Sequence, residues 1–366
     1  MSACENNDCI REISDVERID TDAFYRDSIE KGFVKVADIA RNIEWTTSTA
    51  WGDIQITINL SKPEKDPAAI AAAAKEKDPG KLCDLCVTQG DIDSGYAKNI
   101  QLNGEPWALW YSPYAYFNEH CIAMSWEHRP MHIDRAAFIG LCDFVDRFPQ
   151  YFIGSNADLP IVGGSILAHD HFQGGRHVFP LQEAPIDRAF TMEAFPGVRA
   201  GVVKWPLSVL RLETSDRKAL IEAACCILDA WCAYSNDKLG ISAVTFEGTQ
   251  AIRHNTITPM LRKNGEVYTL DLALRCNITS VEHPLGAFHV HDHLHHIKKE
   301  NIGLIEVMGR AILPPRLMRE MAIDDPTVRA EIGERFAEVL ECCGVFKWDE
   351  TGQAALDAFL SAFAEH

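Results

Sequence analysis

The segment His169-Asp170-His171-Phe172-Gln173 carries three polar side chains at alternate positions. In a regular strand, residues two apart point to the same side, so His169, His171 and Gln173 would share one face. A neutral imidazole is a good nucleophile near pH 7. Glycine pairs flank the segment at Gly163-Gly164 and Gly174-Gly175, and a glycine-rich backbone can approach a phosphate closely. The pattern therefore favours a reaction surface over an exposed polar strand without function.

A second group begins with Cys83 and Cys86, which form a Cys-x-x-Cys pattern. The chain has 12 cysteines, and the adjacent pairs Cys225-Cys226 and Cys342-Cys343 are awkward for disulfides. Because nothing in the sequence indicates secretion, free thiols are expected, and Cys-x-x-Cys then indicates a metal site or a redox site. Two buried thiols without a metal are the alternative.

A third group is a cluster of histidines late in the chain, at His283, His289, His291, His293, His295 and His296. The alternation His289-x-His291-x-His293 by itself fits the pattern of histidine-triad hydrolases and phosphorylases, with His291 as the nucleophile. A solvent-facing polar strand is the simpler explanation of the same alternation.

Hydrophobic periodicity predicts the elements that position these groups. Strands are expected where apolar and polar residues alternate over 54–60, over 120–126, and in several runs between 241 and 275. Helices are expected after the capping residues Asp66, Asp134, Ser215 and Asp325, the last of them ending near Gly344. Strands predominate and helices do not alternate regularly with them. The predicted class is α+β with a largely antiparallel sheet and flanking helices, not a doubly wound parallel sheet.

Two similar segments of the sequence suggest an internal duplication. Residues 163–171 and 284–291 each run from a glycine turn into a strand that ends in His-x-His, and about 120 residues separate them. We therefore expect an N-terminal segment, partly helical, over residues 1–50, a first domain with the active site over 51–200, and a second domain over 201–366.

Composition limits the classes of partner. The formal charge is −18, and no basic run is longer than a pair such as Lys298-Lys299. Such a surface repels nucleic acid and anionic membranes, whereas a few cationic side chains and backbone N–H groups can still hold a small phosphorylated substrate. There is no run of 18 apolar residues and no apolar signal segment at the N-terminus. We expect a cytoplasmic protein.

Longer blocks are similar to the galactose-1-phosphate uridylyltransferase family, specifically its second bacterial class, within the histidine-triad superfamily. The most specific are the run SNADLPIVGGS at 155–165 and the run HDHFQGG at 169–175. Further blocks lie at 57–67, 111–114, 118–122, 254–259 and 296–309. Members of this family resemble two fused histidine-triad domains, which would explain the similarity between residues 163–171 and 284–291.

The resemblance implies a hexose-1-phosphate uridylyltransferase. His171 would attack the α-phosphorus of UDP-glucose and form a uridylyl intermediate, which galactose 1-phosphate would then resolve in a ping-pong exchange. Gln173, being neutral, would hydrogen-bond phosphate oxygens, because a sugar phosphate leaves without much acid help. The family's other substrate contacts match Asn156, Gly164, Ser165 and Lys299.

The resemblance also implies zinc bound by Cys83, Cys86, His128 and His169, which suits tetrahedral Zn²⁺. His128 is preferred over its neighbours His120 and His132, because it follows the predicted strand at the family's position. A second, structural metal would use Glu183, His283, His289 and His291. Two departures stand out: the N-terminal helical region is shorter than in the class, and Val290 stands where proline is common.

The partners expected from the resemblance are UDP-glucose or UDP-galactose and hexose 1-phosphates, with no nucleic acid and no membrane. A homodimer is compatible with it. Two other functions stay open: a histidine-triad hydrolase or phosphorylase that uses His291, and a non-catalytic metal-binding or nucleotide-binding module.

Overall fold

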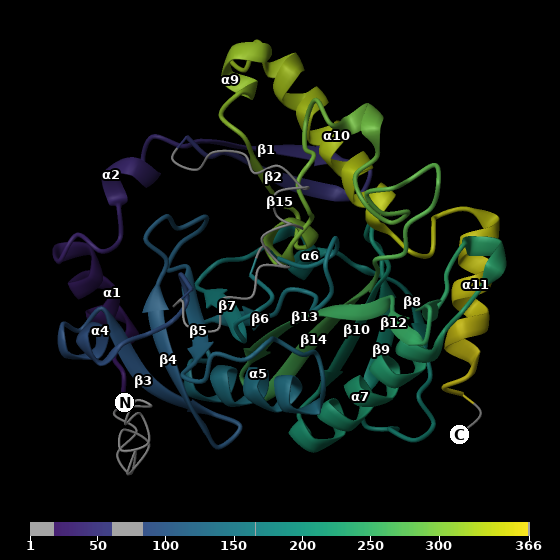
Figure 1. The fold of residues 1–366 in the computed structure, drawn as a ribbon, viewed down its shortest axis with the longest axis horizontal. Helices are drawn as coiled ribbons and strands as arrows, with labels where there is room; N and C mark the ends of the chain where they lie inside the picture. Colours follow the sequence, from purple (N-terminus) through teal and green to yellow (C-terminus); the bar gives the residue numbers. More distant parts are fainter. Residues whose placement is uncertain (1–17, 61–82, 165, 365–366) are drawn as a thin grey trace.

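The computed structural model describes residues 18–60, 83–164 and 166–364. Its centre is a ten-stranded sheet in which every neighbouring pair is antiparallel, with the strand order β3-β4-β5-β7-β6-β13-β14-β10-β9-β8 (Figure 1). This agrees with the predicted α+β class. The helix expected after Asp66 lies outside the described residues.

The sheet consists of two halves of five strands each. The first half contains β3 (Ala97–Leu102), β4 (Glu105–Tyr111), β5 (Cys121–Ser125), β6 (Phe152–Gly154) and β7 (His171–Gly175). The second half contains β8 (Ile186–Phe190), β9 (Arg199–Val203), β10 (Val209–Thr214), β13 (Asn255–Asn264) and β14 (Val267–Cys276). The two orders mirror each other about the β6–β13 pair, so that β7 corresponds to β14.

One helix from each half covers the same face of the sheet. They are α5 (Arg135–Arg147), which follows β5, and α7 (Arg217–Ala233), which follows β10. Asp134 caps α5 as predicted, with its carboxylate accepting the N–H of Ala137 at 3.0 Å. The cap of α7 was predicted one residue early, because Asp216 rather than Ser215 accepts the N–H of Ala219. The expected apolar stripe from Leu220 to Trp231 is buried against the sheet.

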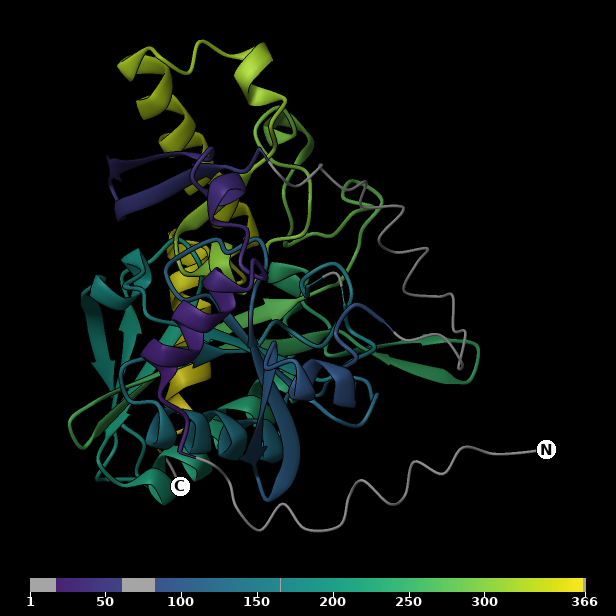
Figure 2. The same cartoon turned by 90° about the vertical axis from the view of Figure 1, so that its left-hand side faces the viewer.

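A smaller layer covers the opposite face. Its three strands are β1 (Ile43–Thr49), β2 (Gly52–Ile58) and β15 (Arg310–Leu313), and β2 pairs in parallel with β15. The helix α10 (Pro326–Cys343) packs on β1 and β2, above the large sheet (Figure 2). The prediction that this helix is the last was wrong, because α11 (Glu350–Ser361) follows it with Leu356, Phe359 and Leu360 buried. A second apolar core fills the space between this layer and the sheet.

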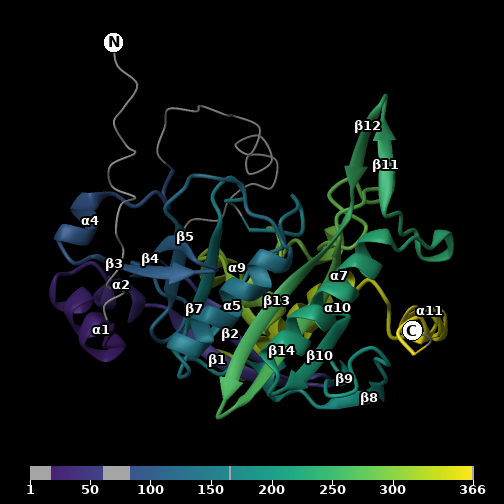
Figure 3. The ribbon, with the colours of Figure 1, turned by 90° about the horizontal axis from the view of Figure 1, so that it is seen from below.

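The remaining elements are short or peripheral: α1 (Thr21–Glu30), α2 (Val36–Ile39), α4 (Gln89–Asp93), α6 (Pro180–Glu183), α8 (Leu304–Val307) and α9 (Leu317–Glu320). A hairpin of β11 (Val244–Glu247) and β12 (Gln250–Arg253) projects from the sheet (Figure 3). Within the described part of the chain, no helix combines the length and the apolar character that crossing a membrane requires.

The interpretation of the two similar His-x-His segments needs correction. The first His-x-His leads into β7, but the second does not lie on β14, the corresponding strand. His289 and His291 lie in the loop after β14, and β14 itself contains no histidine. The duplication is thus present in the strand order and not in the histidine motifs. The division of the chain at residues 50 and 200 stays a prediction. Along the sequence, the chain leaves the first half of the sheet after β7 and enters the second half at β8.

Candidate active site

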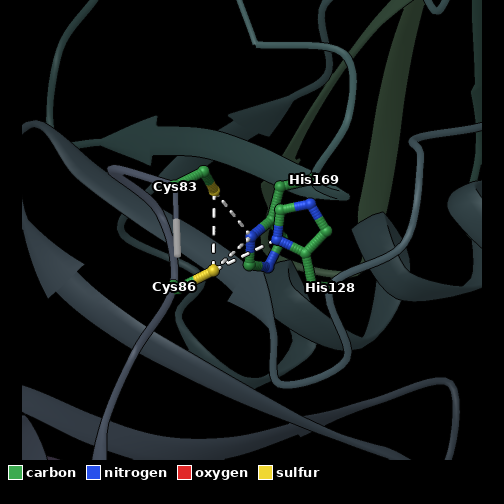
Figure 4. A group of neighbouring side chains, drawn as sticks. All are labelled: Cys83, Cys86, His128 and His169. Carbon is green, nitrogen blue, oxygen red and sulfur yellow. Dashed lines mark hydrogen bonds between the residues drawn. The ribbon is translucent and has the colours of Figure 1, made fainter. Parts of the chain in front are cut away.

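The four predicted zinc ligands converge at one point (Figure 4). Cys83 and Cys86 lie before α4, His128 follows β5, and His169 precedes β7. Their donor atoms all lie within 4.8 Å of one another, and within the described ranges they form the only such group of three or more His, Cys, Asp or Glu side chains. Tertiary structure therefore brings together three segments that are far apart in sequence.

The distances in this cluster suit a tetrahedral ion. The two Sγ atoms are 3.6 Å apart, Cys83 Sγ lies 3.2 Å from His169 Nδ1, and Cys86 Sγ lies 3.1 Å from His128 Nδ1. Bonds of about 2.3 Å to sulfur and 2.0 Å to nitrogen place ligand atoms roughly 3.5–3.8 Å apart, so the S–S distance matches and the two S–N distances are a few tenths of an ångström short. His169 Nε2 lies 2.7 Å from the carbonyl of Ser125 and donates to it, which turns Nδ1 toward the thiols. The donor set and its geometry fit Zn²⁺.

His171 begins β7 and lies opposite Met124 of β5. Its ring is buried, and Nδ1–H donates to the carbonyl of His169 at 2.8 Å, which leaves the lone pair on Nε2. Burial lowers the pKa of His171 to about 4, so the ring is neutral at pH 7. The residue that follows the metal ligand by two positions therefore presents a nucleophilic nitrogen.

The strand pleat separates the apolar and polar sides of β7. Phe172 points toward α5, stacks on Trp107 at 4.8 Å between ring centroids, and fills the space beside Gly140. His171 and Gln173 consequently point to the opposite face of the sheet, as the alternation predicted. His169 precedes the regular strand and reaches the metal cluster from the bend before it.

A cavity of about 280 Å³ lies over this face. One wall comes from the first half of the sheet, including His171 and Gln173, and the other comes from residues 298–306 and 312–314 after the second half. The predicted contacts Asn156 and Gly164 also line the cavity. It is large enough for a small phosphorylated ligand.

Asn156 joins the two walls. Its side-chain carbonyl accepts the N–H of Leu304 at 2.8 Å, so the amide NH₂ is the group left for other partners. A Cβ on Gly164 would lie 2.5 Å from Asn156 Nδ2, which explains why only glycine fits there. Ser165 lies outside the described residues.

The lysine that lines the cavity is Lys298, and not Lys299 as the resemblance implied. Lys298 is buried, and its ammonium lies 2.9 Å from carboxylate oxygens of both Glu300 and Glu306. These carboxylates raise the pKa of Lys298 against the effect of burial. The neighbouring Lys299 is half-exposed and is not among the residues that line the cavity.

The second predicted metal group does not assemble. The rings of His283 and His291 stack at 4.1 Å with 10° between their planes, whereas His289 is buried and Glu183 is exposed at the end of α6. These four described residues do not form a group of converging ligand atoms. His291 does not line the cavity either. Stacking of the two rings accounts for the His283–His291 contact without a metal.

One cavity residue was missed in the sequence. His120 precedes β5, and its Nε2 lies 3.1 Å from Gln173 Oε1. In the sequence, His120 was only an alternative to His128 as a metal ligand, and it is His128 that lies in the Cys/His cluster. Its presence in the block at 118–122 was the signal that could have identified it.

Comparisons with known proteins place this geometry in a family. The model of the galactose-1-phosphate uridyl transferase N-terminal domain matches residues 8–130, and that of the C-terminal domain matches residues 144–334. Galactose-1-phosphate uridylyltransferases of Lactiplantibacillus plantarum and Bacillus subtilis are 47% and 43% identical to the chain. Both alignments cover 93% of this chain, and they cover 78% and 75% of those relatives.

Solved structures agree on the fold alone. Yeast Ap4A phosphorylase in complex with Ap4A matches with a TM-score of 0.52 at 11% identity, covering 90% of this chain and 98% of that one. Another structure of the yeast enzyme matches with a TM-score of 0.50 at 13% identity, covering 90% and 95%. The two family models and the identities above 40% over most of both chains establish that the chain belongs to the galactose-1-phosphate uridylyltransferase family.

Proposed function

We propose that the chain is a nucleotidyltransferase that moves UMP between UDP-glucose and galactose 1-phosphate through a covalent bond to His171. In the first step, Nε2 of His171 attacks the α-phosphorus of UDP-glucose. The P–N bond forms, the P–O bond to the leaving group breaks, and glucose 1-phosphate departs with that electron pair. In the second step, a phosphate oxygen of galactose 1-phosphate attacks the same phosphorus, the P–N bond breaks, and UDP-galactose leaves.

The observation that carries the proposal is the placement of His171 in the cavity wall with its ring orientation set. The hydrogen bond from Nδ1–H to the His169 carbonyl keeps the lone pair on Nε2, and no proton has to be removed before attack. Holding the nucleophile in one orientation lowers the entropic cost of reaching the transition state.

Neutral amides would bind the transferred phosphate. Gln173 and Asn156 both line the cavity, and each has its carbonyl oxygen engaged, by His120 and by Leu304 respectively. Their NH₂ groups therefore remain as donors to phosphate oxygens, which supports charge stabilisation without acid catalysis. Gly164 would allow the backbone to come close to the same phosphate.

Zinc would be held by Cys83, Cys86, His128 and His169. The ion supplies structural cross-linking when bound, because its four ligands come from three distant segments. His169 would link it to the nucleophile, since the carbonyl of this residue accepts the hydrogen bond from His171. We place the enzyme in the cytoplasm, where sugar nucleotides are available to it.

The decisive test is to map the covalent intermediate. The protein is incubated with UDP-glucose labelled in the uridylyl group, without acceptor, and the labelled peptide is sequenced under alkaline conditions. Label on His171 that disappears on addition of galactose 1-phosphate, with UDP-galactose formed, supports the proposal. Label on His291, or UMP released with no transfer to the acceptor, would instead favour the hydrolase or phosphorylase alternative.

A further inference from the structure

His120 is a cavity residue to which the proposed reaction assigns no role. It lies directly before β5, next to β7, where Cys121 is opposite Gly174 and Ile122 is opposite Gln173. Only 2% of His120 is exposed, and Nε2 is 3.1 Å from Gln173 Oε1. His120 therefore lies beside a side chain that we propose binds the transferred phosphate, and it can influence how that side chain is oriented.

The second ring nitrogen determines which way this hydrogen bond runs. Nδ1 of His120 faces the backbone N–H of Tyr116 at 3.5 Å, and a backbone N–H can only donate. Nδ1 is therefore the acceptor, so the proton of the neutral ring is on Nε2. Nε2–H then donates to Gln173 Oε1, and the amide of Gln173 has its NH₂ group left to face the cavity.

The turn that carries His120 is built rigidly. Glu119 has a φ of 53°, a left-handed conformation that is uncommon outside glycine. Its carboxylate accepts hydrogen bonds from the Tyr151 hydroxyl and from Asn118 Nδ2, and pairs with Arg176 Nε at 3.2 Å. Strained backbone that is held by several partners is often found where it orients a functional group.

Packing fixes the same turn against β7. The ring of His120 lies 4.4 Å from that of Phe117, at 34° between the planes. A Cβ on Gly175 would lie 2.6 Å from the Glu119 carbonyl, so the turn rests directly on the strand two residues beyond Gln173. The distance between His120 and Gln173 is thus set by backbone contact as well as by the hydrogen bond.

We infer that His120 is a positioning residue for Gln173, whose amide it holds as a hydrogen-bond donor to the transferred phosphate. The inference rests on the proposed function, because it specifies how one of the phosphate ligands is oriented. Without His120, the amide can rotate and present its oxygen to the phosphate, which repels it.

The test compares two substitutions at this position. His120→Phe keeps a ring against Phe117 and removes the N–H donor, and His120→Gln restores a donor near the place of Nε2. Each half-reaction is followed in a single turnover, first as uridylyl-enzyme formed from UDP-glucose and then as its discharge by galactose 1-phosphate. Losing one neutral hydrogen bond predicts that His120→Phe slows both steps roughly 3- to 15-fold. His120→Gln should recover most of that loss.

A double-mutant cycle separates positioning from general damage to the fold. If His120 acts through Gln173, then His120→Phe should cause no further loss in a Gln173→Ala background. His132→Phe, at an exposed histidine outside the cavity, is the matched control and should keep the wild-type rates.

Three outcomes would overturn the inference. They are wild-type rates in His120→Phe, equal losses in His120→Phe and His120→Gln, and losses that multiply in the double mutant. Each of them leaves the proposed function intact if wild-type enzyme takes label on His171. A wild-type enzyme that takes no label on His171 overturns the proposed function, and the inference with it.

Discussion

The two halves of the large sheet have the same strand order but use the same face differently. On β7, His171 and Gln173 face a cavity. On β14, the corresponding face carries Asp271, which is fully buried and pairs with Arg211 at 2.5 Å and with Arg262 at 2.8 Å. Polar groups that satisfy one another stabilise a layer contact, whereas polar groups that face an open cavity remain available to a substrate. With the proposed function, the duplicated scaffold would carry the chemistry in one half and a structural ion-pair cluster in the other.

The largest expected effect tests which half carries the chemistry. His171→Gly removes the attacking nitrogen and should lower transfer by at least about four orders of magnitude, as expected for loss of a covalent nucleophile. His291→Gly is the matched change in the other His-x-His and should leave the rate within about two-fold. UDP-galactose formation from UDP-glucose and galactose 1-phosphate measures both. A collapse of activity in His291→Gly alone would reverse the assignment.

The Cys/His cluster that could hold a metal lies beside the first half of the sheet, so removing its thiols should affect that half. The Cys83→Ser/Cys86→Ser double mutant should lose the metal, of which we expect about one zinc ion per chain. Its thermal midpoint should also fall, because metal binding is coupled to folding. Elemental analysis and calorimetry measure the two effects. The double mutant Cys225→Ser/Cys226→Ser is the control, and full metal content in the first mutant would exclude these cysteines as ligands.

Substitutions in the second half of the sheet should lower the stability of the protein and leave the rate of transfer unchanged. Asp271→Ala leaves Arg211 buried without its carboxylate and should lower the free energy of unfolding by about 3–5 kcal/mol. The exposed pair Arg135–Glu222 is the control, since Glu222→Ala should leave the free energy of unfolding nearly unchanged. Urea denaturation measures both changes. A folded Asp271→Ala variant with normal stability but no transfer would place chemistry in this half as well.

Substitutions of Gln173 test whether the cavity face of β7 binds the transferred phosphate. Gln173→Ala removes one charge-assisted hydrogen bond of about 1.5–3 kcal/mol and should slow both half-reactions roughly 10- to 150-fold. Gln173→His should keep some transfer and release more UMP to water, because an imidazole can act as a base toward water. The ratio of UMP to UDP-galactose at saturating galactose 1-phosphate is the measurement. Wild-type behaviour of Gln173→Ala would mean that this side chain does not contact the phosphate.

The last prediction concerns His289, which was expected in the second metal group and is buried in the structure. Burial lowers the pKa of His289 to about 4, and the charges of Arg275 and His295 add to this. Between pH 6.5 and 4 the unfolded chain binds a proton there that the folded chain does not, so stability falls as the pH drops through this window. The loss is on the order of 3 kcal/mol. His289→Asn should flatten this dependence in denaturation curves measured at several pH values, whereas the exposed His296→Asn should not.

Local sequence patterns were sufficient to predict several features of this protein. Asp134 and Asp325 were identified as helix caps because capping depends on a short side chain next to its own backbone. The shared face of His171 and Gln173 followed from the two-residue period of a strand. The four proposed zinc ligands were suggested by a resemblance over longer blocks, since no rule of spacing connects Cys83 with His169.

Other features depended on contacts between distant segments, which sequence periodicity does not describe. The repeated His-x-His suggested a second site, yet His289 and His291 lie in a loop beyond the strand that corresponds to β7. Of two adjacent lysines, only the tertiary structure shows that Lys298 lines the cavity, because Glu300 and Glu306 lie close enough to stabilise a buried ammonium. The role of His120 was hidden for the same reason. Its partner Gln173 is 53 residues away along the chain, and only the pairing of β5 with β7 brings the two side chains together.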